Sequence, residues 1–160
     1  MEPFWIETEN ELRLAIVPRP RGGDWLEDEA ISMKNAGIDI LVSMLQAEEA
    51  AELGLITEAD ACRTAGIEFR SFPIQDREVP SSVASFSAFV EQLRAELHSG
   101  RSVGVHCRAS IGRSSMMLAG VLCAEGLPPG DAFKRLTKAR GLQVPDTAEQ
   151  VHWIESFAAR

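Results

Sequence analysis

Residues 105–115 read Val-His-Cys-Arg-Ala-Ser-Ile-Gly-Arg-Ser-Ser, which places a cysteine between a predicted strand and a predicted helix. The segment before the cysteine, residues 101–106, alternates valines with polar residues and is typical of a short buried strand. A helix is expected to begin near Arg113. In parallel α/β sheets, ligands bind beyond the carboxyl ends of the strands. The sequence therefore predicts that Cys107 lies at a ligand-binding edge.

The rest of the chain alternates short apolar strands with amphipathic helices. This pattern predicts an α/β fold with a central, mostly parallel sheet flanked by helices on both faces. No linker, repeat or low-complexity stretch interrupts it, so residues 1–160 are predicted to form a single domain. Strands are expected at 12–17, 38–44, 67–74 and 101–106, and helices at 25–35, 48–53, 58–65, 83–97, 113–124, 131–140 and 147–157.

The loop from Cys107 to Arg113 has the residues that an oxyanion site requires. Ala109, Ser110 and Gly112 are small, so the backbone can approach a ligand closely. Consecutive N–H groups in such a turn can converge on one anion, and the following helix adds unpaired N–H groups and its positive dipole end. Arg113 supplies a planar fork for two phosphate oxygens. The same field favours the thiolate of Cys107, a nucleophile held against bound phosphorus.

The three cysteines have different surroundings. Cys62, Cys107 and Cys123 are an odd number at irregular spacing, which argues against a disulfide framework and against a metal site. Buried cysteines are often inert, and a cysteine six residues before an arginine arises by chance fairly often. Ser114, the small loop residues and the strand-to-helix context favour a functional Cys107. Cys123 is predicted to lie in the core, whereas the sequence around Cys62 predicts neither a structural nor a functional role.

A second segment, residues 72–80, reads Phe-Pro-Ile-Gln-Asp-Arg-Glu-Val-Pro and follows a predicted strand at the same sheet edge. Between Asp76 and Cys107 there is room for one helix and one strand, the crossover that brings parallel strands side by side. An alkoxide or phenoxide leaving group needs a proton donor, and Asp76 is the candidate. Glu78 is the competing acid. Asp76 could alternatively be a turn residue or belong to a helix cap.

The run from His106 to Ser114 resembles the signature loop of the protein tyrosine phosphatase superfamily. Residues 76–80 are similar to that family's mobile general-acid loop, in which an aspartate precedes Val-Pro. The small size and the pattern Pro73-Ile74-x-Asp76 resemble the dual-specificity branch. The likeness extends over residues 38–157, although only these two motifs are specific. It implies a phosphate-binding loop between strand and helix, and phosphomonoester hydrolysis through a cysteinyl-phosphate without a metal or other cofactor.

The resemblance also implies a role for each matched residue. Cys107 attacks phosphorus, and Arg113 with the loop amides binds the phosphoryl oxygens. Asp76 protonates the departing oxygen and then acts as base for the hydrolytic water. Ser114 donates a hydrogen bond to the sulfur. The remaining loop residues would line the substrate phosphate, with His106 as a support for the cysteine: His106, Arg108, Ala109, Ser110, Ile111 and Gly112.

Two segments depart from the family pattern or match it loosely. Asp146 stands where tyrosine-specific members place a water-positioning glutamine. Gln150 matches a later, more structural glutamine, and no catalytic role is assigned to it. The family also braces its loop arginine with an upstream carboxylate, for which Glu48 and Glu49 are candidates. Solvated surface charges are nevertheless the expected account of both glutamates.

Charge and composition narrow the partners. A formal net charge of −8 disfavours nucleic acid and anionic membranes, which leaves phosphorylated proteins or small phosphate esters as expected partners. No apolar run is long enough to span a bilayer, and the first residues lack a signal-peptide pattern, so a cytoplasmic location is expected. The chain has no tyrosine and few aromatic residues, which predicts a shallow pocket open to phosphoserine, phosphothreonine and phosphotyrosine.

Two other functions fit the cysteine loop. Rhodanese-like sulfurtransferases also carry a cysteine between strand and helix, but the Asp76 loop would have no role in sulfur transfer. A phosphate-recognition module could keep the cradle without turnover, although nothing that turnover needs is missing. A lipid or small-metabolite phosphate stays open as substrate. The oligomeric state is not predicted.

Overall fold

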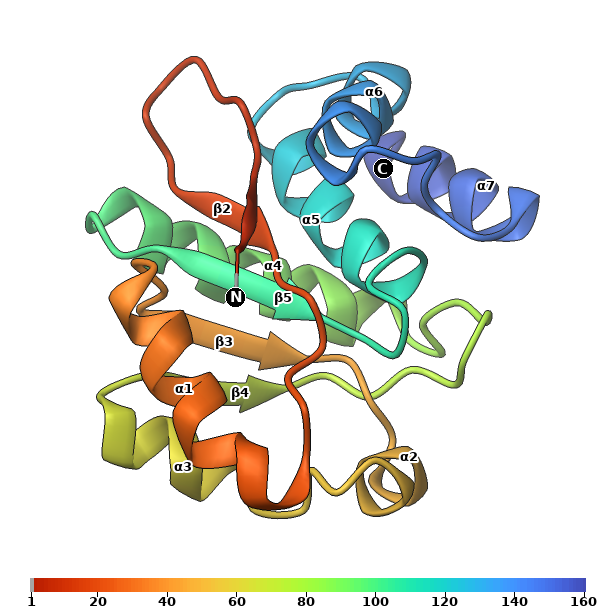
Figure 1. Cartoon of the computed structure of the whole chain (residues 1–160). Helices are drawn as coiled ribbons and strands as arrows, with labels where there is room; N and C mark the ends of the chain where they lie inside the picture. Colours follow the sequence, from red (N-terminus) through yellow and green to blue (C-terminus); the bar gives the residue numbers. More distant parts are fainter. Residues whose placement is uncertain (1) are drawn as a thin grey trace.

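The computed structural model describes residues 2–160, and its centre is one five-stranded sheet (Figure 1). The strand order is β1-β2-β5-β3-β4. Strands β2, β5, β3 and β4 run parallel, and β1 pairs antiparallel with β2, so the predicted mostly parallel sheet is confirmed. The two-residue β1 was not predicted. The strands are β1 (Phe4–Trp5), β2 (Leu14–Ile16), β3 (Ile40–Ser43), β4 (Glu68–Ser71) and β5 (Val103–His106).

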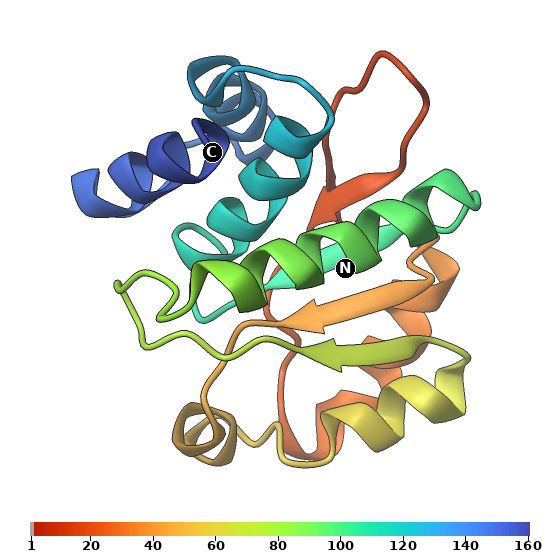
Figure 2. The same ribbon diagram turned by 180° about the vertical axis from the view of Figure 1, so that it is seen from behind.

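Helices cover both faces of the sheet, as predicted. Helices α1 and α3 lie on one face, and α4 lies on the other (Figures 1 and 2). Helix α5 packs against α4, α6 and α7, and these helices share the larger apolar core. The helices are α1 (Leu26–Asn35), preceded by a 3₁₀ turn (Gly23–Trp25), α2 (Ala47–Glu52), α3 (Glu58–Ala65), α4 (Val83–His98), α5 (Arg113–Ala124), α6 (Pro129–Arg140) and α7 (Ala148–Ala158).

Helix α4 sets the position of α5, which follows the cysteine loop. Ser82 caps α4 by accepting a hydrogen bond from the N–H of Ser85. The buried face of α4 carries Phe86, whose ring lies so close to Gly120 of α5 that an added Cβ would meet it at 2.7 Å. Glycine at this point lets the two helices approach closely. The start of α5 is thereby held beside the end of β5.

The sheet register brings the strand ends together at one edge. Ser43 at the end of β3 pairs with His106 at the end of β5, and also with Ser71 at the end of β4. Loops that follow these strands therefore leave from the same edge. The expectation that the strands before Asp76 and Cys107 are neighbours was wrong, because β3 lies between β4 and β5. The crossover through α4 passes over one intervening strand.

Candidate active site

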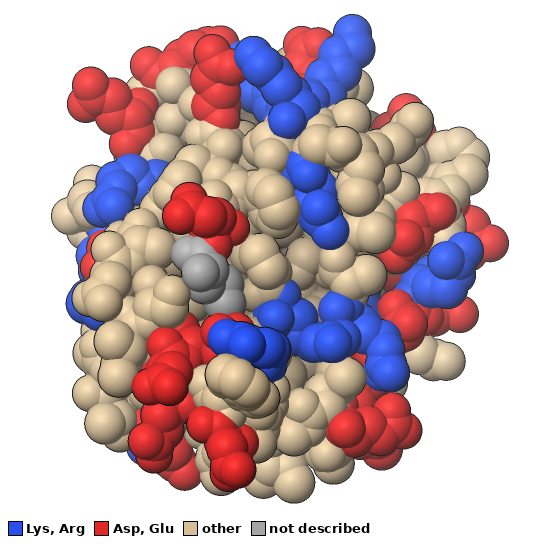
Figure 3. All heavy atoms as spheres, viewed as in Figure 1, with Lys and Arg blue, Asp and Glu red and all other residues tan. Residues whose placement is uncertain are grey.

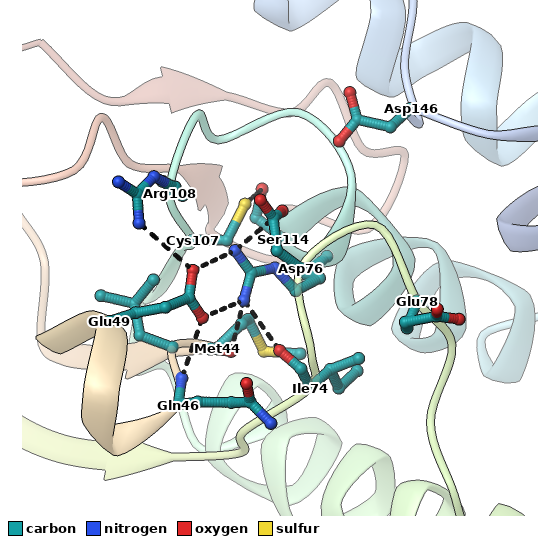
Figure 4. Close-up of polar contacts among 12 residues, drawn as sticks. Met44, Gln46, Glu49, Ile74, Asp76, Glu78, Cys107, Arg108, Ser114 and Asp146 are labelled. Carbon is teal, nitrogen blue, oxygen red and sulfur yellow. Dashed lines mark hydrogen bonds and ion pairs between the residues drawn. The ribbon is translucent and has the colours of Figure 1, made fainter.

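The cysteine loop runs from the end of β5 to the first turn of α5, as Figure 4 shows. Cys107 is buried, with 3% of its surface exposed, at the base of the loop. Its Sγ lies 3.4 Å from Oγ of Ser114, which is within hydrogen-bond distance for sulfur. Ser110 has a positive φ of 56° and its hydroxyl donates to the carbonyl of Val17 at 2.7 Å, so the cysteine loop is tied to the residue that follows β2.

Arg113 is the most connected side chain of the site, and it is almost fully buried. Its guanidinium donates to both carboxylate oxygens of Glu49, at 2.6 and 2.9 Å. It also donates to the carbonyl of Ile74 at 2.7 Å and to Asp76 Oδ1 at 3.1 Å. The expectation that Glu49 is a solvated surface charge was wrong. Helix α2, which follows β3, turns this carboxylate inward, whereas Glu48 stays exposed.

The Arg113–Glu49 pair stabilises both charges. Burial opposes the charged form of each group, but their mutual hydrogen bonds outweigh it: the pKa of Arg113 is raised and the pKa of Glu49 is lowered. The charges of Cys107 and Asp76 also favour the Arg113 cation. Because the Glu49 pKa is lower when folded, its stabilising contribution is present at neutral pH and is lost on acidification through the lowered value.

Asp76 lies in a turn that brings it to the arginine. The N–H of Glu78 donates to the carbonyl of Gln75, and Arg77 has a positive φ of 67°, so residues 75–78 form a tight turn. Asp76 is about half exposed and contacts Arg113. The side chain of Glu78 points away from the cysteine in Figure 4. The structure therefore brings Asp76, and not Glu78, into contact with Arg113.

Gln150, on α7, and Asp146, in the connection before α7, flank the cysteine loop. Gln150 is fully buried; its Oε1 accepts from the N–H groups of Asp146 and Thr147, and its Nε2 donates to the carbonyl of Glu78 at 3.1 Å. Gln150 thus joins the turn at residues 75–78 to the start of α7, and its contacts are those of a structural residue. A Cβ at Gly112 would lie 2.5 Å from Asp146 Oδ2. The Asp146 carboxylate therefore lies directly beside the cysteine loop.

His106 belongs to a buried pair that the sequence did not reveal. Its Nε2 lies 2.6 Å from Glu58 Oε2, and its Nδ1 lies 3.2 Å from the carbonyl of Cys107. Each ring nitrogen of His106 therefore has a partner, one a side-chain carboxyl group and the other a backbone carbonyl. Glu58 thereby fixes the ring that supports Cys107.

Glu58→Leu is expected to lower the free energy of unfolding by about 3 kcal/mol, because breaking a buried pair leaves His106 without its partner. Urea denaturation measures the change. Glu48→Leu, at an exposed position, is the control and is expected to change the value by about 0.5 kcal/mol or less. Equal, small effects of the two substitutions would contradict a structural role for Glu58.

The other two thiols are separate from the site. Burial, together with the negative charge of Glu58, raises the pKa of Cys62 to about 12. Burial raises the pKa of Cys123, which lies on α5 and packs against the core as expected, to about 11. Both thiols therefore stay protonated at neutral pH and are weak nucleophiles.

We expect iodoacetamide at pH 7 to alkylate Cys107 well before Cys62 or Cys123. The reason is that only Cys107 adjoins Arg113 and the amino end of α5. Mass spectrometry of peptides after graded exposure measures the order of modification, and Cys107→Ser protein is the control. Modification of Cys62 or Cys123 at a comparable rate would contradict a selectively reactive Cys107.

A pocket of about 590 Å³ opens beside the cysteine loop. It meets the loop at Ile111 and is otherwise formed by the connection between α6 and α7 and by the first turns of α7. Aliphatic and polar side chains line it, with no Phe or Trp among them. The lining residues are Ile111, Gln143, Val144, Pro145, Asp146, Thr147, Ala148, Val151 and His152.

A buried cysteine at a strand end, a helix-opening arginine braced by a carboxylate, and a nearby aspartate define the class of cysteine-dependent phosphatase folds. Residues 17–127 match the family model described as "Polymorphic toxin system, DSP-PTPase phosphatase". The match covers more than half of the chain. The chain therefore belongs to this family of dual-specificity-type phosphatases.

A curated relative and several solved structures are similar to this chain. A protein of Invertebrate iridescent virus 6 named "Putative tyrosine phosphatase 197R" is 24% identical over 138 residues, which is 83% of this chain and 48% of the viral protein. The chain thus spans about half the length of that relative. Kinase-associated phosphatase, with its catalytic-site cysteine replaced by serine, has a TM-score of 0.90 at 20% identity, covering 99% of this chain and 94% of its own.

Two further solved structures share the fold. Tk-PTP in its active form has a TM-score of 0.78 at 22% identity, covering 100% of this chain and 99% of its own. PTPMT1 in complex with PI(5)P has a TM-score of 0.75 at 19% identity, covering 91% of this chain and 90% of its own. At these identities the likeness establishes the fold. None of the helices within residues 2–160 has the length and apolar character to cross a membrane.

Proposed function

We propose that this chain hydrolyses phosphomonoesters in two steps through a phosphate bound to Cys107, with residues 1–160 acting as one catalytic domain. The observation that carries the proposal is the position of Arg113. Its guanidinium is fixed from behind by Glu49 and by the Ile74 carbonyl, and it adjoins both Cys107 and Asp76. A fixed cation beside a nucleophile and a proton donor is what phosphoryl transfer requires.

In the first step the Cys107 sulfur bonds to phosphorus as the bond from phosphorus to the leaving oxygen breaks. Asp76 gives its proton to that oxygen, and the alcohol or phenol departs. In the second step Asp76 takes a proton from water, whose oxygen bonds to phosphorus as the sulfur–phosphorus bond breaks. The Ser114 hydroxyl, 3.4 Å from the sulfur, donates a hydrogen bond that stabilises the departing thiolate. Inorganic phosphate is released.

Phosphorylated protein side chains are the substrate class that we favour. The pocket beside Ile111 holds no Phe or Trp among its lining residues, so no wall of large aromatic side chains there would select phosphotyrosine over shorter side chains. This supports activity on phosphoserine and phosphothreonine as well as phosphotyrosine. A cytoplasmic location is part of the proposal. PTPMT1 was solved with a phosphoinositide, so phosphoinositides belong in the substrate panel.

Hydrolysis of p-nitrophenyl phosphate by the purified chain tests the function. We expect turnover that is inhibited by vanadate and unaffected by EDTA, since neither proposed step uses a metal. A panel of phosphoserine, phosphothreonine and phosphotyrosine peptides, phosphoinositides and small phosphate esters identifies the substrate class. Sulfur transfer from thiosulfate to cyanide without phosphate release would favour a rhodanese-like function, and phosphate binding without turnover would favour a recognition module.

Asp76→Asn is expected to lower kcat about 100-fold for alkyl phosphates, which have poor leaving groups. The loss should be much smaller for p-nitrophenyl phosphate, whose leaving group needs little protonation. Steady-state kinetics across a series of aryl and alkyl phosphates measures this dependence. Glu78→Gln is the matched control and should leave every rate near the wild-type value. An equal loss across the series would remove Asp76 from the role of acid.

A further inference from the structure

Side-chain nitrogen atoms contact the outer surface of the cysteine loop at every backbone carbonyl from Cys107 to Ser110. His106 contacts the Cys107 carbonyl at 3.2 Å, and Arg19 donates to the Arg108 carbonyl at 3.0 Å. Arg140 reaches two carbonyls at once: its Nη2 donates to Ala109 at 3.2 Å and its Nε to Ser110 at 3.0 Å. These donors come from β5, from the segment after β2 and from the last turn of α6.

The inner surface of the same loop presents backbone N–H groups instead of carbonyls. Within residues 2–160, no backbone carbonyl accepts a hydrogen bond from the N–H groups of residues 108–112. A peptide unit that turns its carbonyl outward turns its N–H inward, so the held carbonyls and the free N–H groups are two consequences of one conformation. A peptide unit that flips would place a carbonyl oxygen against the bound anion and remove one donor from it.

We propose that Arg140, assisted by Arg19, is a positioning residue that keeps the loop amides turned toward the phosphate. The inference rests on the proposed function, because it assigns these arginines to the phosphate cradle of that site. The planar guanidinium of Arg140 spans neighbouring carbonyls, which the single ammonium of a lysine does not do with the same geometry. The guanidinium of Arg140 also stacks over the ring of Phe4, with its central carbon 4.7 Å from the ring centre. This contact fixes the direction of the Arg140 side chain.

The positive charge around the cysteine loop also favours binding of an anion. Although the chain has a formal net charge of −8, Lys and Arg side chains form a band across the middle of the face seen in Figure 3, over the carboxyl end of β5. Guanidinium groups behind the loop also polarise the peptide units so that their N–H groups become better donors. The effects of side-chain shape and of charge can be separated, because lysine at position 140 keeps the positive charge but lacks the planar guanidinium.

Calorimetric titration with tungstate, an oxyanion that mimics phosphate, tests the proposal on the Cys107→Ser background, where no turnover interferes. Arg140→Gln and Arg140→Lys are both expected to weaken tungstate binding about tenfold, since each loses the two-carbonyl contact. Arg19→Gln, which removes one contact, should weaken it about threefold. Arg135→Lys is the matched control on the same helix: Arg135 contacts Glu7 and Glu9, away from the loop, and its replacement should leave binding unchanged.

Hydrogen exchange separates positioning from general destabilisation. In Arg140→Gln, amides 108–112 are expected to exchange faster while the thermal midpoint stays near that of the parent protein. Wild-type binding by Arg140→Lys would show that charge alone matters and would overturn the proposal. A lowered thermal midpoint with faster exchange throughout the chain would overturn it as well. If native protein fails to hydrolyse p-nitrophenyl phosphate but the binding series holds, the proposed function fails and the positioning role stands.

Discussion

Cys107→Ser is expected to lower kcat for p-nitrophenyl phosphate on the order of 10⁴-fold or more, because removal of a covalent nucleophile stops the first step. A serine hydroxyl keeps a similar shape but is not ionised at neutral pH by the field that favours a thiolate. The cradle of amides and Arg113 stays in place, so affinity for tungstate should be retained within about threefold. Stopped assays with a sensitive phosphate detector measure the residual rate.

Cys123→Ser is the control for this substitution. Cys123 lies on α5 with its thiol protonated, so its replacement should leave kcat near the wild-type value. Turnover by Cys107→Ser within about tenfold of wild type would mean that another group attacks phosphorus. Loss of tungstate binding together with turnover would mean instead that the substitution disrupted the cradle.

Arg113→Lys is expected to lower kcat/KM for the same substrate by about 10³-fold. The guanidinium has donors enough to hold Glu49 with both oxygens accepting, to bond the Ile74 carbonyl and to turn an N–H toward the phosphate. An ammonium group cannot fill these positions together. Because a charge is retained, a large loss would be due to geometry. Steady-state kinetics gives the change.

Arg135→Lys is the matched control for this exchange of one cation for another. Arg135 lies on α6 and contacts Glu7 and Glu9, away from the cysteine loop. Its replacement should change kcat/KM by less than about threefold. If the two lysine variants lose the same activity, the bidentate pair with Glu49 has no special part in catalysis.

The fold was largely predictable because its elements carry local signals. The apolar face of α4 repeats at helical spacing behind a serine cap, and Gly66 ends α3 in a left-handed conformation, as helix stops do. Strand order is a different matter. Nothing in the local pattern says that β3 separates β4 from β5, because that order depends on packing between distant segments. The two residues of β1 are too few to form a detectable pattern.

The site residues also fall into those that local sequence predicts and those that depend on distant segments. Cys107, Arg113 and Ser114 lie in one loop, so their spacing predicts their proximity. Glu49 and Glu58 come from 64 and 48 residues before their partners, and a glutamate in a helix is usually a solvated charge. One signal did point to Glu49: it follows a buried strand at the sheet edge where the cysteine loop lies. Arg19 and Arg140 gave no such signal, because a carbonyl contact leaves no mark in sequence.

The central claim is that phosphate passes through the sulfur of Cys107. Acid quenching of the Asp76→Asn variant during turnover, followed by mass spectrometry of its peptides, tests this directly, because loss of the base slows hydrolysis of the intermediate. We expect a phosphoryl group on the peptide that contains Cys107 and on no other. Steady turnover without a phosphorylated peptide, or a phosphoryl group on a different residue, would contradict the account.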